Sequence, residues 1–181
     1  MPQALLTLPA RATAEITVYD NREVAHAWVF GGNGFLSYKV NARYVAFGNA
    51  YPDPATIASE SETPLLRLVA CLNELAQSNS RFQIVANAED AQITLLADVS
   101  LVAITVTDNE LDEHIWLFED CGLSGYEVNG NLFTPAESYP DAVTIASASE
   151  TDVPFLRRLV NCLNLLDVTA QRFMLPAALR F

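Results

Sequence analysis

The residues Ile16-Thr17-Val18-Tyr19-Asp20-Asn21 open a stretch, 16–63, that recurs without a gap 88 residues later, starting with Ile104-Thr105-Val106-Thr107-Asp108-Asn109. The two stretches share 22 identical residues over 48 aligned positions. Unrelated sequences of ordinary composition would match at roughly one position in sixteen. The sequence therefore predicts a tandem duplication of a unit of about 90 residues, packed with pseudo-two-fold symmetry.

The correspondence extends beyond the repeated stretch in both directions. Upstream, Leu5-Leu6-Thr7-Leu8 aligns with Ile93-Thr94-Leu95-Leu96. Downstream, a three-residue insertion at 152–154 is followed by matches that include Cys71 with Cys162. We therefore expect repeats at 1–88 and 89–181. The link between them is too short for independent domains, so the second repeat should pack closely on the first.

Each unit has the pattern of four successive strands with short turns, an antiparallel meander, followed by a helix and a final strand. Apolar residues at positions 65, 68, 69, 72 and 75 follow the i, i+3, i+4, i+7 spacing of an amphipathic helix. The expected strands of the first unit are 5–8, 13–19, 26–30, 37–41 and 81–85. The sequence thus predicts an α+β fold made of two ββββαβ units.

Composition narrows the classes of function. The net charge is −12, with ten basic residues and a hydrophobic content of 51%. Scarce Lys and Arg disfavour direct binding of a nucleic-acid backbone, whereas an acidic surface favours a protein partner with a basic surface. No apolar run approaches the ~20 residues that cross a bilayer, and no signal-peptide pattern is present, so we expect a cytoplasmic protein that binds no membrane. The composition is compatible with a homodimer as well as with a monomer.

An acidic cluster distinguishes the second unit from the first. The residues of the first unit that align with Glu110, Asp112, Glu113, Glu119 and Asp120 are Arg22, Val24, Ala25, Gly31 and Gly32, none of which is acidic. The structural interpretation is a solvated turn. The functional interpretation is a patch that docks on a basic protein surface. The cluster consists of Asp108, Glu110, Asp112, Glu113, Glu119 and Asp120.

The longest shared word is Tyr-Pro-Asp-x-x-Thr-Ile-Ala-Ser-x-Ser-Glu-Thr, at 51–63 and 139–151. A turn followed by helix-capping residues accounts for most of it. The alternative is a small-ligand site in a cleft between the repeats. Its lining would be Tyr51, Asp53 and Thr56 with Tyr139, Asp141 and Thr144.

The two histidines, His26 and His114, occupy the same place in each unit, two residues before its only tryptophan. They suggest an enzyme with a non-standard site of histidine and carboxylate groups. One histidine per unit, however, gives neither a triad nor a zinc set. A His-x-Trp-x-Phe strand face that packs under the helix or at the interface between the units is the favoured interpretation.

These observations lead to a functional hypothesis. The sequence has no nucleotide-binding, nucleophile or metal-binding motif, so we expect no cofactor. We predict a non-catalytic acidic protein-binding module, an adaptor or an inhibitor acting by protein–protein contact. A narrower form of the hypothesis is an inhibitor of a nucleic-acid-handling enzyme, of the kind found in conflicts of phages or plasmids with their hosts.

Overall fold

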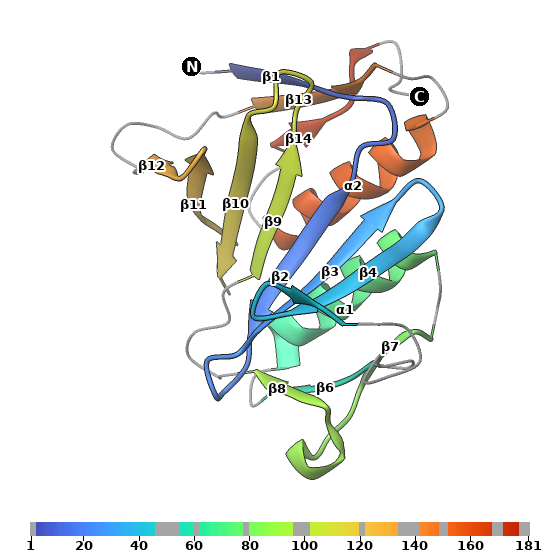
Figure 1. Cartoon of the computed structure of the whole chain (residues 1–181), viewed down its shortest axis with the longest axis vertical. Helices are drawn as coiled ribbons and strands as arrows, with labels where there is room; N and C mark the ends of the chain where they lie inside the picture. The colour runs from blue at the N-terminus through green and yellow to red at the C-terminus, as the bar shows by residue number, and fades with distance from the viewer. Residues whose placement is uncertain are drawn as a thin grey trace.

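The computed structural model of this chain describes residues 3–45, 55–59, 62–77, 80–95, 102–119, 122–133, 142–148, 152–167 and 172–177. Within these ranges the chain has a mixed α+β fold with two α-helices and three sheets (Figure 1). The largest sheet has eight strands. A three-stranded sheet lies toward each end of the long axis of the molecule (Figure 1).

The eight-stranded sheet is antiparallel and joins strands from both halves of the chain in the order β12-β11-β10-β9-β2-β3-β4-β5. Three of the strands that this sheet takes from the first half of the chain match those expected at 13–19, 26–30 and 37–41. The bounds are Ala14–Tyr19 (β2), Ala25–Gly31 (β3), Gly34–Val40 (β4), Arg43–Tyr44 (β5), Val102–Thr107 (β9), Glu113–Glu119 (β10), Gly122–Val128 (β11) and Asn131–Phe133 (β12).

The two halves of this sheet meet where β2 pairs with β9. Ile16 lies opposite Ile104, the residue that recurs 88 positions after it. On either side of this pair, Ala14 faces Val106 and Val18 faces Val102. The sheet is therefore continuous across the chain midpoint, and every inward residue of β2 and β9 is buried.

The two smaller sheets are parallel, and each takes a strand from the other half of the chain. β1 (Gln3–Leu8) pairs with β13 (Ala142–Ser147), which pairs with β14 (Phe173–Met174). β8 (Ile93–Leu95) pairs with β6 (Ala55–Ser59), which pairs with β7 (Phe82–Ile84). The prediction that each unit begins its own meander with 5–8 or 93–96 is therefore wrong. These first strands are exchanged.

The strand pairings also correct the alignment of the exchanged strands by one residue. Leu6 faces Ile145 in β13, and Ile93 faces Ile57 in β6. Ile57 and Ile145 are 88 residues apart, so Leu6, rather than Leu5, is the counterpart of Ile93. The register is fixed by burial, because Leu6, Leu8, Ile93 and Leu95 all point into the core.

The shared word contributes more regular structure than a turn and caps. Its Thr-Ile-Ala-Ser segment forms β6 in the first half and β13 in the second, the central strand of each parallel sheet. Ile57 and Ile145 are fully buried there. The helix α1 (Glu62–Ala76) begins within the last residues of the shared word, and residues 60 and 61 lie outside the described residues.

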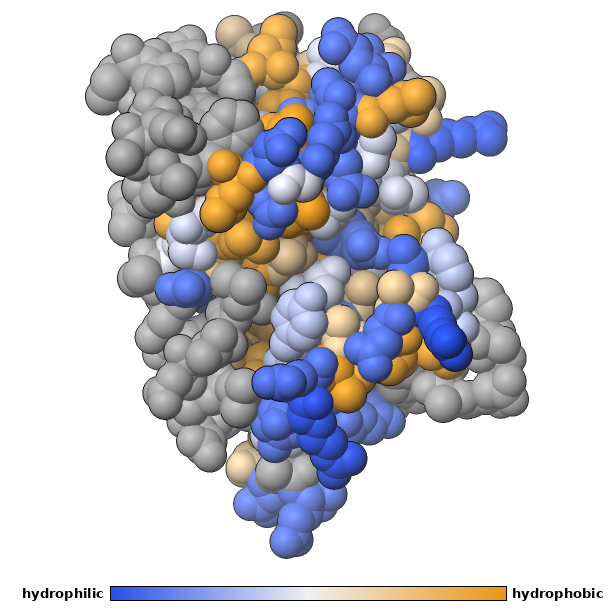
Figure 2. Space-filling model, turned by 60° about the vertical axis from the view of Figure 1, so that its left-hand side comes forward, coloured by the Kyte–Doolittle hydropathy of each residue, from blue (hydrophilic) through white to orange (hydrophobic). Residues whose placement is uncertain are grey.

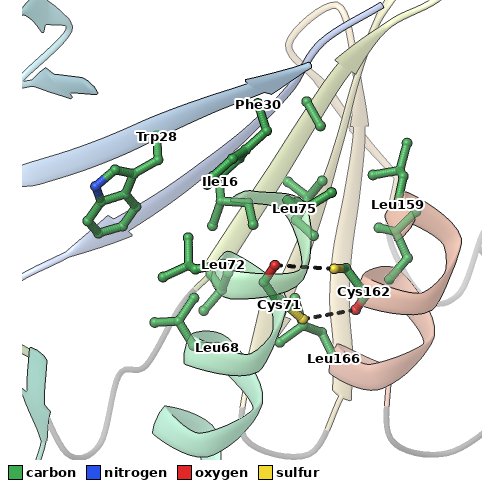
Figure 3. Packing of buried hydrophobic residues seen from close by; sticks show 14 of the residues in the cluster. Ile16, Trp28, Phe30, Leu68, Cys71, Leu72, Leu75, Leu159, Cys162 and Leu166 are labelled. Carbon is green, nitrogen blue, oxygen red and sulfur yellow. Dashed lines mark hydrogen bonds between the residues drawn. The ribbon is translucent and has the colours of Figure 1, made fainter. Parts of the chain in front are cut away.

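The core lies between the eight-stranded sheet and the two helices, α1 and α2 (Val153–Leu166) (Figure 3). The expected stripe of α1 is buried throughout, from Leu65 to Leu75. Where the helices cross, the thiols of Cys71 and Cys162 each donate to the carbonyl oxygen of the other residue at 3.4 Å. Both cysteines are free and buried. In the described ranges, neither helix has the length and apolar character needed to cross a membrane.

Candidate functional site

The most elaborate polar structure in the described chain is built twice, at the turns that follow β2 and β9. We name residues 20–25 the neutral turn and residues 108–113 the acidic turn. In the neutral turn, Oδ1 of Asp20 accepts hydrogen bonds from the backbone N–H groups of Arg22 at 2.8 Å and Val24 at 3.0 Å. In the acidic turn, Oδ1 of Asp108 accepts from Glu110 and Asp112 at the same two distances. Each carboxylate thus closes its own turn.

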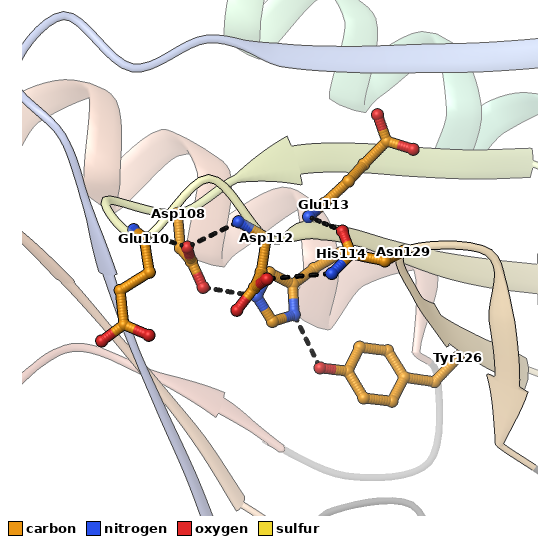
Figure 4. A network of polar contacts seen from close by, with 7 residues as sticks. All are labelled: Asp108, Glu110, Asp112, Glu113, His114, Tyr126 and Asn129. Atoms are coloured by element: carbon orange, nitrogen blue, oxygen red, sulfur yellow. Dashed lines mark hydrogen bonds and ion pairs between the residues drawn. The ribbon is translucent and has the colours of Figure 1, made fainter.

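The other carboxylate oxygen of each aspartate binds a histidine, and Figure 4 shows this contact for Asp108 and His114. Asp108 Oδ2 lies 2.8 Å from Nε2 of His114, and Nδ1 of that ring lies 2.7 Å from the Tyr126 hydroxyl. The Asp20, His26 and Tyr38 side chains make the same two contacts at the same distances. A carboxylate only accepts, so Nε2–H donates to it, and in the neutral imidazole Nδ1 then accepts from the tyrosine.

Burial and hydrogen bonding set the protonation states of these groups. Burial raises the pKa of Asp108, but hydrogen bonds from His114 and from two backbone N–H groups lower it more, so the net pKa lies below its usual value. Asp20 behaves in the same way with His26. Burial and the nearby aspartate raise the pKa of Tyr38, and likewise that of Tyr126, to about 12. Ionised aspartate and neutral tyrosine are therefore the favoured forms.

This chemistry suits a structural anchor better than a catalytic relay. An Asp–His–Tyr chain could activate a tyrosine only if the phenolate were accessible, yet Tyr38 and Tyr126 are 5% and 7% exposed and resist ionisation. Each histidine ring also stacks with the neighbouring tryptophan, Trp28 or Trp116. The predicted His-x-Trp-x-Phe face is confirmed, since all three side chains of each copy are buried.

An asparagine completes the scaffold of each turn. Oδ1 of Asn41 accepts from the Ala25 N–H at 2.9 Å, and Oδ1 of Asn129 accepts from the Glu113 N–H at 2.8 Å. In the acidic turn alone, Nδ2 of Asn129 also donates to the Asp112 carboxylate at 2.9 Å. The two turns therefore share one backbone framework and differ in the side chains that it presents.

The acidic turn presents carboxylates around an exposed leucine. Glu110 and Glu113 are exposed and Asp112 is half-buried, whereas Asp108 is only 8% exposed and serves the interior. Leu111, at the tip, is 82% exposed and has a left-handed φ of 68°. That backbone conformation costs a non-glycine residue roughly 1–2 kcal/mol. The neutral turn places Glu23 at the same tip, with a φ of 63°.

The predicted acidic cluster does not form one patch. The acidic turn brings together four of its six residues. Glu119 is exposed at the far end of β10, about 20 Å away along the strand. Asp120 lies outside the described residues.

The predicted ligand cleft is not assembled by the residues that can be placed. Thr56 lies in β6 and Thr144 in β13, in sheets at opposite ends of the molecule (Figure 1). The hydroxyl of Thr56 accepts from the Gln92 N–H at 3.0 Å, so it helps to hold the entry to β8. The other four predicted lining residues, Tyr51, Asp53, Tyr139 and Asp141, lie outside the described residues.

The two histidines are also far apart. His26 pairs with Val18 and His114 with Val106, and these valines lie at opposite ends of the β2–β9 pairing. A site that uses both imidazoles is therefore not built. In the parts of the chain that the structure describes, no group of three His, Cys, Asp or Glu side chains is arranged to hold a metal ion.

Two open hollows mark the described surface. One, of about 360 Å³, adjoins the neutral turn and is lined by Asp20, Asn21, Arg22, Glu89, Ala91, Gln92 and Thr94. The other, of about 510 Å³, lies beside the β3–β4 turn and the start of α2, and includes Arg11, Gly32 and Asp152. Both are open to solvent, and the second includes the apolar side chain of Leu36 in its lining. Figure 2 shows hydrophobic residues in separate groups between hydrophilic ones on the face that it presents.

Comparisons with known proteins add no functional information, because no family model, no curated protein and no solved structure matches this chain. Sequence reasoning overlooked Leu111 and the Tyr126–Asn129 support of the acidic turn. The available signal was the recurrence of four polar residues at one spacing, Asp20, His26, Tyr38 and Asn41, against Asp108, His114, Tyr126 and Asn129.

Proposed function

We propose that this chain is a non-catalytic protein-binding module, an adaptor or an inhibitor, that contacts a basic protein surface through the acidic turn. The observation that carries the proposal is that the two turns share one hydrogen-bonded backbone framework and expose different side chains. Apart from the buried Asp20, the charged residues of the neutral turn are Arg22 and Glu23, which are exposed and whose charges cancel. The acidic turn carries Glu110, Asp112 and Glu113, with no basic residue. Fold stability alone does not require this difference.

The form of the acidic turn fits a protein partner. Leu111 is an exposed apolar residue between Glu110 and Asp112 in the sequence, which suits an apolar pocket bordered by Lys or Arg. The buried anchor of Asp108 and His114 holds the turn in place before binding, so little ordering entropy is lost on association. An inhibitor of a nucleic-acid-handling enzyme is the narrower form of this proposal, because such enzymes carry basic surfaces.

A duplication explains why the scaffold occurs twice. We infer that the chain arose by tandem duplication of a unit of about 90 residues with pseudo-two-fold packing. In support, Ile16 pairs with Ile104, Cys71 and Cys162 exchange hydrogen bonds, and both first strands cross to the opposite half. After duplication, selection for partner binding would act on the acidic turn and not on the neutral turn.

The experiment compares capture of partners by matched variants. The protein is immobilised and exposed to lysate of its source cells at about 50 mM and about 500 mM salt, and bound proteins are quantified by mass spectrometry. We expect a partner that salt releases, that Glu110→Gln/Glu113→Gln binds at least about tenfold less, and that Arg22→Gln/Glu23→Gln binds normally. Equal capture by both double variants, or capture that salt does not weaken, would contradict the proposal.

A further inference from the structure

The exchanged strands β1 and β8 differ in how their outer edges are covered. β8 has three residues, and its outward carbonyl, at Thr94, accepts the Asn21 N–H at 2.8 Å. A bridge between Asp20 and Leu95 covers it further. β1 has six residues, and among the described residues only Asn109 reaches its outer edge, by donating to the Thr7 carbonyl at 2.8 Å. The first half of β1 extends beyond this cover.

The hydrogen-bond pattern identifies which groups of β1 point outward. The Leu8 carbonyl accepts from Ala148, on the side of β13, and the Thr7 carbonyl accepts from Asn109, on the opposite side. Backbone groups alternate between the two sides of a strand, so Gln3 and Leu5 also direct their N–H and C=O groups outward. β1 is thus the edge of its sheet, with backbone donors and acceptors along residues 3–5.

The composition of this edge lacks the usual protection against pairing. Sheet edges are commonly blocked by charged side chains, proline or bulges. The sequence of β1, Gln3-Ala4-Leu5-Leu6-Thr7-Leu8, contains no charge and no proline. Leu5 is 71% exposed beside the open edge.

We propose that this edge is a self-association surface, where β1 of one copy pairs antiparallel with β1 of a second copy about a two-fold axis at Ala4. Each Gln3 then faces Leu5 of the other copy, and both residues of such a pair exchange their N–H···O=C bonds. A second copy supplies the matching groups at the same spacing, because the pairing is isologous. The two parallel sheets merge into one across the dimer, and both Leu5 side chains lose exposure.

Charge opposes this association in a way that can be measured. Each copy carries a net charge of −12, and the acidic turn borders β1 at the Asn109–Thr7 contact. Salt screens repulsion between two such copies, so the dimer strengthens as salt rises. Binding of a basic partner at the acidic turn weakens as salt rises. The two associations therefore respond to salt in opposite directions and can be distinguished by it.

Sedimentation velocity of the full chain between about 5 µM and about 500 µM, at low and high salt, tests the proposal. We expect the mass to rise from 19.8 kDa toward twice that value, more readily at high salt. Leu5→Pro removes the outward N–H without touching the β1–β13 bonds, and Leu5→Lys adds a charge to the edge. Both variants should remain monomeric over the whole range.

Leu132→Lys is the matched control, since Leu132 is 58% exposed on β12, an edge of the eight-stranded sheet. It should dimerise like the parent chain. Hydrogen exchange of the Leu5 amide provides a readout without any substitution, and should slow as concentration rises. A chain that stays monomeric throughout, or a dimer that persists in both Leu5 variants, overturns the proposal.

Discussion

Asp20 and Asp108 show how one residue type serves both structure and display. Each carboxylate closes its turn through two backbone N–H groups and holds a histidine with its second oxygen. Because the aspartate is buried, it is withdrawn from the surface that it organises. The charge that a partner can meet comes instead from neighbours such as Glu110 and Glu113.

The ionised form of these aspartates gives a pH dependence with a definite sign. Their folded-state pKa values are lowered, so their contribution to stability is present above the unfolded value of about 3.9 and is lost as the pH falls through the folded value. We expect Asp20→Asn/Asp108→Asn, which keeps the turn acceptors, to lose less unfolding free energy than the parent chain between about pH 5 and pH 2.

Urea unfolding at each pH measures this difference. Glu110→Gln/Glu113→Gln removes the same number of carboxylates from exposed positions and is the control. It should follow the acid dependence of the parent chain closely. If the aspartate and glutamate variants had the same acid slope, the lowered pKa values of Asp20 and Asp108 would not contribute to stability.

At the scale of elements, the exchange of β1 and β8 is the main departure from what the sequence predicts. Period-2 patterns and turn residues located β2, β3, β4 and the helix stripe, because these signals are local. The choice of partner for an exchanged strand is not local. Leu6-Thr7-Leu8 and Ile93-Thr94-Leu95 carry nearly the same pattern, so either parallel sheet could accept either strand. Residue patterns alone cannot decide between these pairings.

The acidic turn illustrates the same limit on the candidate site. The Asp-Asn pair predicted a turn, and the charge difference between the copies singled out 108–113. The burial of Asp108 depends on the tertiary contacts of His114, and Glu119 is distant because it lies at the other end of β10. Those contacts follow from the pairing of β10 with β11, which places Tyr126 beside His114.

Because β1 pairs with β13 and β8 pairs with β6, a substitution in either exchanged strand should destabilise the sheet that it joins. Leu8 in β1 and Leu95 in β8 are both buried, at 1% and 4% exposure. Truncation of either to alanine should cost about 2–5 kcal/mol. We expect Leu8→Ala to accelerate hydrogen exchange mainly in β13 and β14, in the opposite half of the chain, and Leu95→Ala to accelerate it mainly in β6 and β7.

Amide hydrogen exchange followed by mass spectrometry of peptides resolves these regions, and each variant is the control for the other. If Leu8→Ala loosened β6 and β7 instead, β1 would be packed in its own half. That outcome would rule out the exchange.

At the scale of the whole molecule, one sheet and one helix pair fuse the two halves, and the surface of the two turns differs. The continuous β2–β9 pairing and the α1–α2 contact leave no boundary along which the halves could separate without exposing core. The two halves share one core, and it holds a neutral turn and an acidic turn on equivalent supports. A functional difference between them must therefore come from their side chains.

The most direct test exchanges the side chains of the two turns and leaves their buried aspartate and histidine in place. One variant carries the neutral-turn residues in the acidic turn, as Glu110→Arg, Leu111→Glu, Asp112→Val and Glu113→Ala. The reciprocal variant changes Arg22→Glu, Glu23→Leu, Val24→Asp and Ala25→Glu. Partner capture, with thermal unfolding as the check on folding, should fall at least about tenfold in the first variant and be maintained in the second. Full capture by a folded first variant would contradict the assignment of binding to the acidic turn.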